Sequence, residues 1–172
     1  MSRVDEMIIS FDVYEDSIEY LGMSEVTLPQ ISNLTQEISG AGLGGNVEAV
    51  ATGILAAMNL TLNFRTVTPA AIRLLEPRIH KIDLRVAQQS QDTRSNTIDI
   101  NKLKHIMKIR PKGLNPGKAA VASTADASGE YSVLSYAMYM DGVKKIEVDP
   151  IKFIYFVNGK DYLQDIRRAL GK

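Results

Sequence analysis

The pattern of apolar and polar positions is clearest in residues 58–77, MNLTLNFRTVTPAAIRLLEP. The first part of this segment alternates apolar and polar residues, which is the period-two pattern of a half-buried strand. Thr68 then stands where a helix N-cap belongs, and Pro69 suits the first helical position because its missing N–H is not needed there. The segment therefore predicts a strand joined directly to a short helix that ends before Pro77. The apolar positions of the strand are Leu60, Leu62 and Phe64.

A second alternating segment covers residues 81–89. The chain then turns at residues 91–96 and returns through residues 97–110. Together these segments predict a long hairpin. Its distal half is too polar to be buried on either face, and a hairpin that projects beyond its own core usually lies against a partner.

Less regular segments precede these elements. We expect short strands at residues 13–21 and 25–28, while residues 31–38 fit either a strand or a loop. Residues 46–57 fit a helix by their small side chains and a strand by their Val, Thr and Gly positions. Between these two ambiguous segments, SGAGLGG at residues 39–45 predicts a flexible loop.

The C-terminal third contains one strong turn signal. Asp141–Gly142 is typical of a tight hairpin turn, and it joins predicted strands at residues 131–140 and 143–157. Before them, residues 111–129 are rich in Gly, Pro, Ser and Ala and lack periodicity, which predicts a long loop. Loops of this length are often functional or held by a neighbour.

The chain ends in a predicted helix at residues 161–170, with Asp161 as its N-cap and Gln164 completing a capping box. The pattern then gives about seven or eight strands and two short helices, which cap the strands rather than alternate with them. This favours a mainly β fold, an antiparallel β-sandwich or barrel with two short α-helices. The length fits one domain, residues 1–172.

The composition mainly excludes particular kinds of site and segment. The chain has no cysteine, so we expect neither a disulfide framework nor a thiolate metal site. No apolar run approaches the ~20 residues of a membrane-spanning helix. The N-terminus carries acids where a signal peptide would carry bases. We therefore expect a soluble protein, made in the cytoplasm, that does not insert into a membrane.

Charge is unevenly distributed although the net charge is zero. Residues 1–64 hold nine acids and one base, Arg3, which sum to −8, and the remainder holds nineteen bases and eleven acids, which sum to +8. One interpretation is neutralisation within a single fold. The other is head-to-tail self-association, in which the acidic face of one copy meets the basic face of the next.

Patterns of catalytic chemistry are weak. Gly40, Gly42 and Gly45 match G-x-G-x-x-G, but the following segment is a poor helix and no acid lies about twenty residues beyond, so a nucleotide site is the less favoured alternative. His80 and His105 have no metal-ligand spacing, and we interpret them as satisfied or solvated surface residues. No serine stands in a G-x-S-x-G elbow. We expect no enzyme activity, cofactor or metal.

A basic cluster lies in the second half of the chain, with Asp99 as its one acid. Phosphate binding needs such a density of positive charge, but the cluster has no aromatic residue to stack on bases and no helix to enter a groove. An electrostatic contact with the acidic N-terminal third of a neighbouring copy fits better. The cluster comprises Arg94, Lys102, Lys104, Lys108, Arg110, Lys112 and Lys118.

Five longer blocks carry a family resemblance across residues 13–172. In order, they are VYEDSIEYLGMSEVTLP, ISGAGLGG, LTLNFRTVTPAAIRLLEP, HKIDLRVAQQ and FIYFVNGKDYLQDIRRALG. The chain thereby resembles the major tail tube proteins of contractile-tailed bacteriophages. Residues 101–133 match only in outline, with an R-P-K-x-x-N-x-G-K pattern at residues 110–118.

The resemblance implies a structural virion protein of the tail tube, assembled in the host cytoplasm. Its hexameric rings would stack into a hollow tube, and each subunit would give strands to an oligomeric inner β-barrel that passes DNA as a transient cargo. The implied partners are further copies of the chain, a contractile sheath protein, and baseplate and tail terminator proteins. R-type bacteriocins and other contractile injection systems have similar tubes, so a DNA-free particle is the alternative.

This picture gives two sets of candidate residues. A strongly basic lumen would trap DNA, so we expect the basic cluster to point partly away from the channel or to be neutralised across an interface. The candidates for subunit interfaces are Gly40, Gly42, Gly45, Arg65, Lys108, Arg110 and Lys112. The candidates for the lumen are Asp83, Arg85, Gln89, Asp99 and Asn101.

Overall fold

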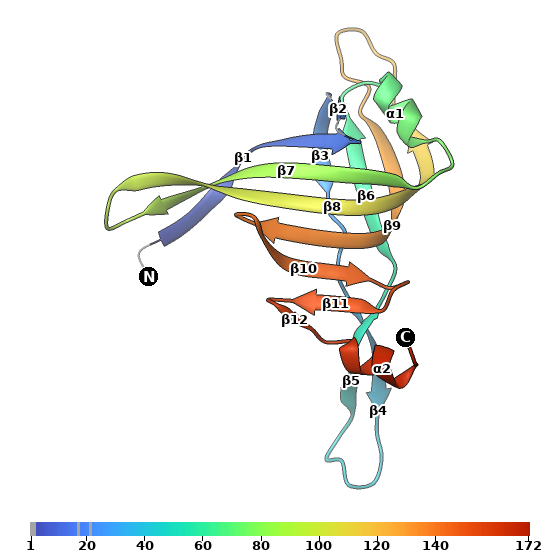
Figure 1. Ribbon diagram of the computed structural model, residues 1–172. Helices are drawn as coiled ribbons and strands as arrows, with labels where there is room; N and C mark the ends of the chain where they lie inside the picture. The colour runs from blue at the N-terminus through green and yellow to red at the C-terminus, as the bar shows by residue number, and fades with distance from the viewer. Residues whose placement is uncertain (1–2, 17, 21) are drawn as a thin grey trace.

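The computed structural model describes residues 3–16, 18–20 and 22–172, so Ser17 and Leu21 of the expected first strand lie outside the described residues. Within this part of the chain, ten strands form one sheet and two form a separate hairpin (Figure 1). The bounds are β1 Arg3–Glu15, β2 Ile18–Tyr20, β3 Met23–Thr27, β4 Asn33–Ile38, β5 Val47–Leu55, β6 Met58–Phe64, α1 Pro69–Leu74, β7 His80–Asp92, β8 Thr97–Asn115, β9 Ala127–Met140, β10 Val143–Asp149, β11 Ile154–Val157, β12 Lys160–Asp161 and α2 Gln164–Ala169.

The large sheet has the strand order β12-β11-β10-β9-β8-β7-β1-β2, and β6 joins it by pairing with β9 on one side and β3 on the other. Each pairing between described strands is antiparallel. The predicted class, mainly β and antiparallel with two short helices, is confirmed.

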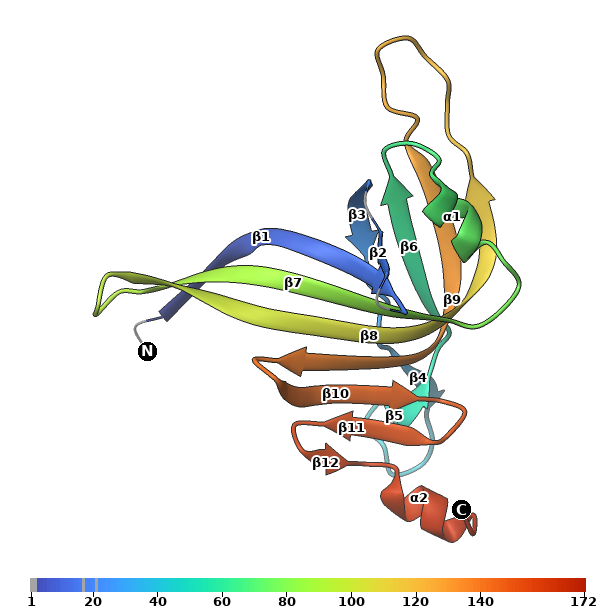
Figure 2. The ribbon, with the colours of Figure 1, turned by 45° about the horizontal axis from the view of Figure 1, so that its top comes forward.

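Two strands bend from one layer of the fold into another. The register between β8 and β9 shifts between Lys108 and Ile109 and again between Pro111 and Gly113, and such bulges bend a strand and increase its twist. The first layer therefore contains β1, β7, β10, β11 and β12 with the adjoining parts of β8 and β9. The second contains β3, β6 and the other ends of β8 and β9, which cross the first layer steeply (Figures 1 and 2).

The core lies between these layers. The alternation predicted for β6 and β7 is confirmed, because their apolar positions are buried and the residues between them are more exposed. Burying these side chains is the main favourable term in folding, at roughly 25 cal/mol per Å² of apolar surface. The fully buried apolar residues include Leu60, Leu62, Phe64, Ile82, Met107, Ile109 and Tyr131.

The predicted joint between β6 and α1 is also confirmed. The Thr68 hydroxyl accepts a hydrogen bond from the Ala71 N–H at 3.3 Å, and Pro69 is the first helical residue. Ala71 and Leu74 face the core, whereas Ile72 is 58% exposed. A six-residue helix buries only its inner face.

An arm of three strands projects from the first layer. It consists of residues 3–10 of β1 and residues 87–102 of β7 and β8, and it reaches well beyond the core (Figure 1). The long β7–β8 hairpin was predicted. The first strand was expected only from residue 13, but it begins at Arg3 and pairs with β7 up to Asp92.

The hairpin β4–β5 leaves the body at the end opposite α1 (Figure 1). The glycine-rich loop at residues 39–45 is its turn, and residues 46–57 prove to be largely a strand rather than a helix. The loop therefore connects two antiparallel strands. A helix N-terminus, which a dinucleotide site would need for the pyrophosphate, does not follow it.

Two predicted boundaries in the C-terminal third are wrong. The loop expected at residues 111–129 is shorter, because β8 continues to Asn115 and β9 begins at Ala127; the bulge next to Pro111 accommodates the missing N–H. The strand expected at residues 143–157 is divided into β10 and β11. The Asp149 carboxylate accepts hydrogen bonds from the N–H groups of Ile151 and Lys152 and so forms a turn there.

The last helix is shorter than the predicted range of residues 161–170, and its predicted N-cap is wrong. Leu163 occupies the N-cap position and makes no side-chain hydrogen bond, while Asp161 belongs to β12. The Asp161 carboxylate instead accepts from the Leu163 N–H at 3.0 Å and pairs with Arg167 at 2.6 Å. Burial alone would raise the pKa of the Asp161 carboxyl. The hydrogen bonds and the Arg167 charge outweigh this effect and lower the pKa below its ordinary value.

Candidate assembly surfaces

Both edges of the arm lack a strand partner among the described residues. On one side β2 pairs with β1 only between Val13 and Glu15, so residues 3–12 form an open edge. On the other side the pairing of β8 with β9 starts at Leu103, which leaves residues 97–101 open. Open edges present unpaired N–H and C=O groups and are ready templates for pairing with another chain.

The arm also exposes large apolar side chains along these edges. Each of them is more than half exposed in the isolated chain. Large apolar side chains exposed together in this way are typical of an interaction site. The residues are Val4, Met7, Ile8, Ile9, Ile98 and Ile100.

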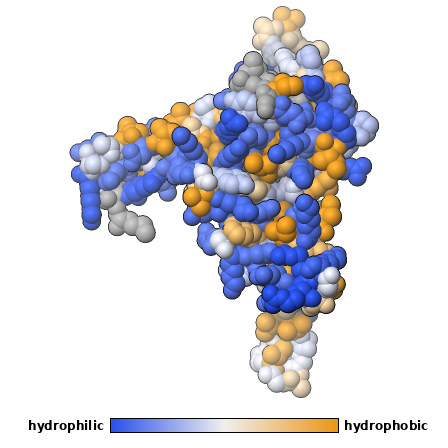
Figure 3. Space-filling view, in the orientation of Figure 1, coloured by the Kyte–Doolittle hydropathy of each residue, from blue (hydrophilic) through white to orange (hydrophobic). Residues whose placement is uncertain are grey.

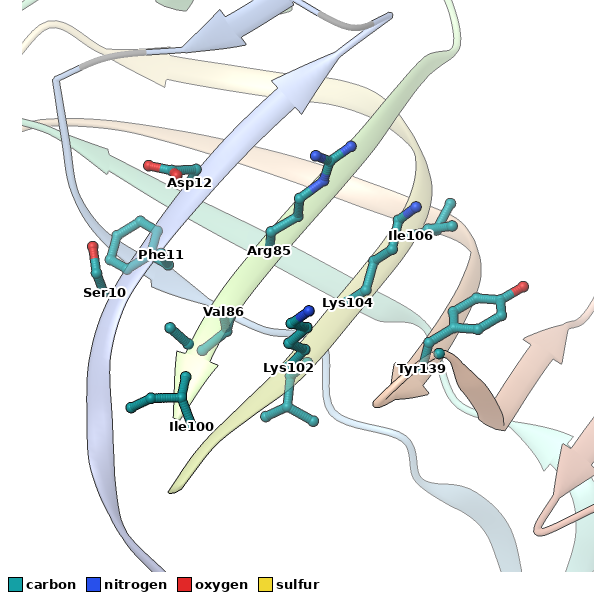
Figure 4. A pocket seen from close by; sticks show the side chains of 13 residues that line it. Ser10, Phe11, Asp12, Arg85, Val86, Ile100, Lys102, Lys104, Ile106 and Tyr139 are labelled. Atoms are coloured by element: carbon teal, nitrogen blue, oxygen red, sulfur yellow. The ribbon is translucent and has the colours of Figure 1, made fainter. Parts of the chain in front are cut away.

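A groove of about 770 Å³ lies at the root of the arm, on the outer face of the first layer (Figure 4). Its cationic side chains come from β7 and β8, and Tyr139 of β9 closes one side. The Arg85 guanidinium lies 4.5 Å from the centre of the Tyr14 ring. Asp83, next to the groove, pairs with Arg85 at 3.2 Å and with Lys104 at 3.5 Å. The positive charge is therefore partly neutralised within the subunit.

The five lumen candidates do not share one face. The pairing of β7 with β8 places Asp83, Arg85 and Gln89 on the outer face of the first layer. Asp99 and Asn101 lie opposite Ser90 and Gln88, on the face that continues into the core. Side chains of directly paired residues point to the same side of a sheet. If one face of this layer lines a channel, that face therefore carries either Asp83, Arg85 and Gln89 or Asp99 and Asn101, but not both sets.

The seven interface candidates fall in three places. Gly40, Gly42 and Gly45 lie in the turn of β4–β5, and Arg65 follows β6 at the opposite end of the molecule. The remaining three, Lys108, Arg110 and Lys112, lie along β8, where the Lys112 ammonium donates to Asn59 at 3.3 Å. The described structure brings no two of these groups together.

A buried polar cluster connects the end of β1 to the segment between α1 and β7. Glu15, at the end of β1, is 2% exposed, and its carboxylate lies 2.5 Å from His80 Nδ1 and 3.2 Å from the Arg78 guanidinium. On its other side, His80 Nε2 donates to the Glu76 carbonyl at 3.0 Å. Nε2 is therefore the donor to this carbonyl, and Nδ1 faces the Glu15 carboxylate.

The interpretation of the histidines as surface residues is wrong, because His80 and His105 are both buried. His105 Nδ1 lies 2.7 Å from the Tyr136 hydroxyl and the two rings stack. Burial lowers the pKa of His105 and raises the pKa of Tyr136 to about 12. Both histidines sit at inward positions of strands, which their place in the alternating pattern could have indicated.

The sequence did not predict the open edge formed by residues 3–12 of β1. Two register shifts, between Asp5 and Met7 and between Ile8 and Ser10, interrupt the pairing of β1 with β7. Each extra residue reverses the alternation, so RVDEMIISFDV shows no period of two. The signal that remains is the run Met7–Ile9, which is apolar without being part of the core.

A metal-binding cluster and a membrane-spanning helix are both absent from the described residues. No group of three or more His, Asp or Glu side chains there is placed to hold a metal ion. None of the helices found in residues 3–16, 18–20 and 22–172 is long and apolar enough to cross a membrane.

The chain is similar to a curated tail tube protein and to a chain of a solved structure. The tail tube protein of Escherichia phage P2 is 23% identical over 163 residues, which cover 93% of this chain and 94% of that protein. A chain in the cryo-EM structure of the PVC sheath/tube terminator, from an extracellular contractile injection system in its extended state, has a similar fold. The TM-score is 0.53 at 15% identity, with 76% of this chain and 94% of that one covered.

The model of the phage tail tube protein FII family matches residues 5–171. This is a family of structural tail proteins and not of enzymes, in agreement with the expectation from the sequence. The match includes residues 101–133, where the resemblance seen in the sequence was only an outline. The chain therefore belongs to the phage tail tube protein FII family.

Proposed function

We propose that this chain is the subunit of the inner tube of a contractile tail, in which six copies close into a ring and rings stack into a hollow conduit for DNA. The observation that carries the proposal is the arm, whose open edges at residues 3–12 and 97–101 lie on opposite sides of one projecting sheet. Edge pairing between neighbours is a heterologous contact, which forms a ring when the rotation closes.

The outer face of the first layer is proposed to line the channel. Its other face is packed against β6 and is therefore not available. Asp83, Arg85 and Gln89 then face the lumen, whereas Asp99 and Asn101 contact a neighbour. A wall of mixed charge suits a conduit, because Asp83 offsets part of the charge of Arg85 and Lys104, and an unbalanced cationic wall would retain DNA.

The proposed partners follow from this assembly. A sheath protein surrounds the tube, and baseplate and terminator proteins occupy its two ends in the virion tail, which is assembled in the host cytoplasm. The similarity to a chain from an extracellular contractile injection system favours a second candidate, the tube of a particle without DNA. Nuclease-protected DNA in purified particles distinguishes the two.

Electron microscopy of the purified chain at high concentration tests the assembly. The expected result is sixfold rings and tubes, and the double variant Ile8→Asp/Ile9→Asp, on the open edge of β1, abolishes both because charge at an apolar edge contact is strongly unfavourable. Its thermal unfolding stays close to wild type, since both residues are more than half exposed.

The matched control is Val121→Asp, which places the same charge on a 99% exposed residue outside the arm and leaves assembly intact. A wild-type chain that stays monomeric, even when mixed with its sheath and baseplate proteins, would overturn the proposal.

A further inference from the structure

An irregular part of β5 joins the hairpin β4–β5 to the body. Asn33 pairs with Leu55, whereas the next residue of β4, Leu34, pairs with Ala51, so the residues of β5 in between form a bulge. Gly53 lies in the middle of this bulge and has a φ of +78°, a conformation that glycine adopts without strain. Bulges bend the strand that contains them. The bulge therefore determines the direction in which the hairpin leaves the body.

The hairpin forms a small sheet of its own. It joins no larger sheet in the described part of the chain, and a two-stranded sheet is marginally stable alone in water. Figure 3 shows it projecting from the body with hydrophobic side chains on its surface, and Leu34, Ile38, Val47 and Val50 are each between 45% and 56% exposed. The orientation of the hairpin thus depends on contacts at its root.

The side chain of Leu163, just before α2, lies directly on the bulge. A Cβ at Gly53 would be 2.5 Å from Leu163 Cδ2 and 2.8 Å from Leu163 Cγ, so only glycine fits there while Leu163 keeps its position. Leu163 is 2% exposed, yet among the described residues it does not belong to the core cluster between the two layers. Leu163 is therefore buried against the root of the hairpin rather than in the main core.

Polar contacts within the C-terminal segment, residues 161–172, hold Leu163 in this position. The Leu163 N–H donates to the Asp161 carboxylate at 3.0 Å, and the Leu163 carbonyl accepts from the Arg167 N–H at 2.9 Å. The Arg167 guanidinium pairs with Asp161 at 2.6 Å and donates to the Phe153 carbonyl at 2.6 Å. Arg167 thereby connects the C-terminal segment to the turn before β11, which belongs to the large sheet.

The pairing of the hairpin itself does not need Leu163. The Gly53 N–H donates to the Asn33 side-chain oxygen at 3.0 Å, and the Ala56 N–H donates to the Ser32 carbonyl at 2.8 Å. These hydrogen bonds join the two chains of the hairpin at its root. The contact with Leu163 instead joins the hairpin to a different part of the molecule, so its loss changes the direction of the hairpin and leaves its pairing in place.

We propose that Leu163 is a positioning residue, through which the C-terminal segment holds the hairpin β4–β5 at one angle to the body. Glycine at position 53 lets the Leu163 side chain reach the backbone of the bulge, and Arg167 keeps that side chain in place. Without this contact the hairpin swings about the bulge. The inference concerns the single subunit, so it goes beyond the proposed tube and does not rest on it.

Distances between two spin labels test the proposal. The chain has no cysteine, so Thr35→Cys on the hairpin and Lys81→Cys on β7, both exposed, give one label on each part. Double electron–electron resonance on dilute, unassembled protein should give one narrow distance distribution. In Leu163→Ala its width should grow by about twofold or more, because local opening at a weakly held element then needs little free energy.

Two substitutions on the same segment are controls. Leu163→Met keeps most of the apolar volume and should retain the narrow distribution. Leu170→Ala removes the same atoms as Leu163→Ala from a side chain that is 55% exposed, and it should also leave the distribution narrow. Arg167→Met leaves Leu163 in the chain but removes the guanidinium contacts, and it should widen the distribution less than Leu163→Ala does.

Two results would overturn the proposal. One is a distribution for Leu163→Ala that is as narrow as that of the Leu170→Ala control, because the hairpin would then be held without Leu163. The other is loss of the folded subunit in Leu163→Ala, seen by circular dichroism, because Leu163 would then serve the main core. Neither result depends on rings or tubes, whose absence counts against the proposed function alone.

Discussion

At the scale of single residues, buried polar side chains hold the joint between β1, α1 and β7. Glu15 bridges Arg78 and His80, which belong to the segment that enters β7, and His80 in turn binds the carbonyl of Glu76 after α1. Glu15 belongs to the acidic part of the chain, residues 1–64, whereas Arg78 and His80 belong to the basic remainder. Part of the opposite charge carried by residues 1–64 and by the rest of the chain is therefore balanced inside the subunit.

Replacing Glu15 should show how much this cluster contributes. Glu15→Ala leaves the buried His80 Nδ1 without its partner, and an unsatisfied buried polar group lowers the free energy of unfolding by about 1–3 kcal/mol. Glu15→Gln keeps the volume and one hydrogen bond to His80, so its effect should be less than half as large. Urea unfolding measures both, and a loss under about 1 kcal/mol for Glu15→Ala would contradict the assignment.

His105 should make the stability of the subunit depend on pH. Burial lowers its pKa in the folded state below the ordinary value of 6.5, so the unfolded chain binds the proton first. The free energy of unfolding therefore falls as the pH drops below 6.5, and it levels off once the pH is below the pKa of the folded state. A tenfold difference in proton affinity between the two states corresponds to about 1.4 kcal/mol.

The variant His105→Gln retains a partner for the Tyr136 hydroxyl but does not titrate. Its free energy of unfolding should change less than that of wild type between about pH 7.5 and about pH 5, as measured by urea unfolding at each pH. Equal pH dependence in the two proteins would show that His105 is not the titrating group.

At the scale of elements, the sequence predicts those parts whose alternation serves the core. The strand β6 and the cap of α1 are predicted because their residues do in the fold what the local pattern indicates. Leu60 and Phe64 alternate along β6 and are buried, and Thr68 caps α1. The same alternation predicts β7. The hairpin β4–β5 was ambiguous because its exposed apolar face serves no core. α2 was misplaced because Asp161 forms an Asx-type turn rather than a cap, and both uses require the same residue type.

The loop at residues 116–126 is an element whose shape depends on one glycine. Gly117 has a φ of +79°, and a Cβ at this position would lie 1.9 Å from the Ala125 carbonyl oxygen. That oxygen accepts the Lys118 N–H at 2.8 Å and so closes the base of the loop. Gly117→Ala should therefore lower the free energy of unfolding by about 2 kcal/mol or more and expose the loop to proteolysis.

Gly45→Ala is the matched control, because a Cβ there meets no atom within 4 Å and its φ lies outside the left-handed region. It should change stability by under about 0.5 kcal/mol. Equal effects of the two substitutions in thermal or urea unfolding would show that the base of the loop is not closed by Gly117.

At the scale of the whole molecule, the class of fold and its core strands follow from the pattern, whereas of the projecting parts only the β7–β8 hairpin and a loop before β9 were predicted. The arm, the hairpin and the loop extend from the body in different directions (Figures 1 and 2). Many of their apolar residues are exposed rather than buried in the core. A pattern that is read for burial in one subunit therefore does not predict their structure. For the same reason, Asp99 and Asn101 were grouped with Asp83 by polarity, although register puts them on opposite faces.

The two open edges of the arm belong to different strands, so a ring that they close in the proposed assembly has two different faces. Rings of this kind, stacked in one orientation, would give a tube with two different ends. A protein shaped to stop growth at one end would not fit the other, so the two ends would be controlled by different molecules.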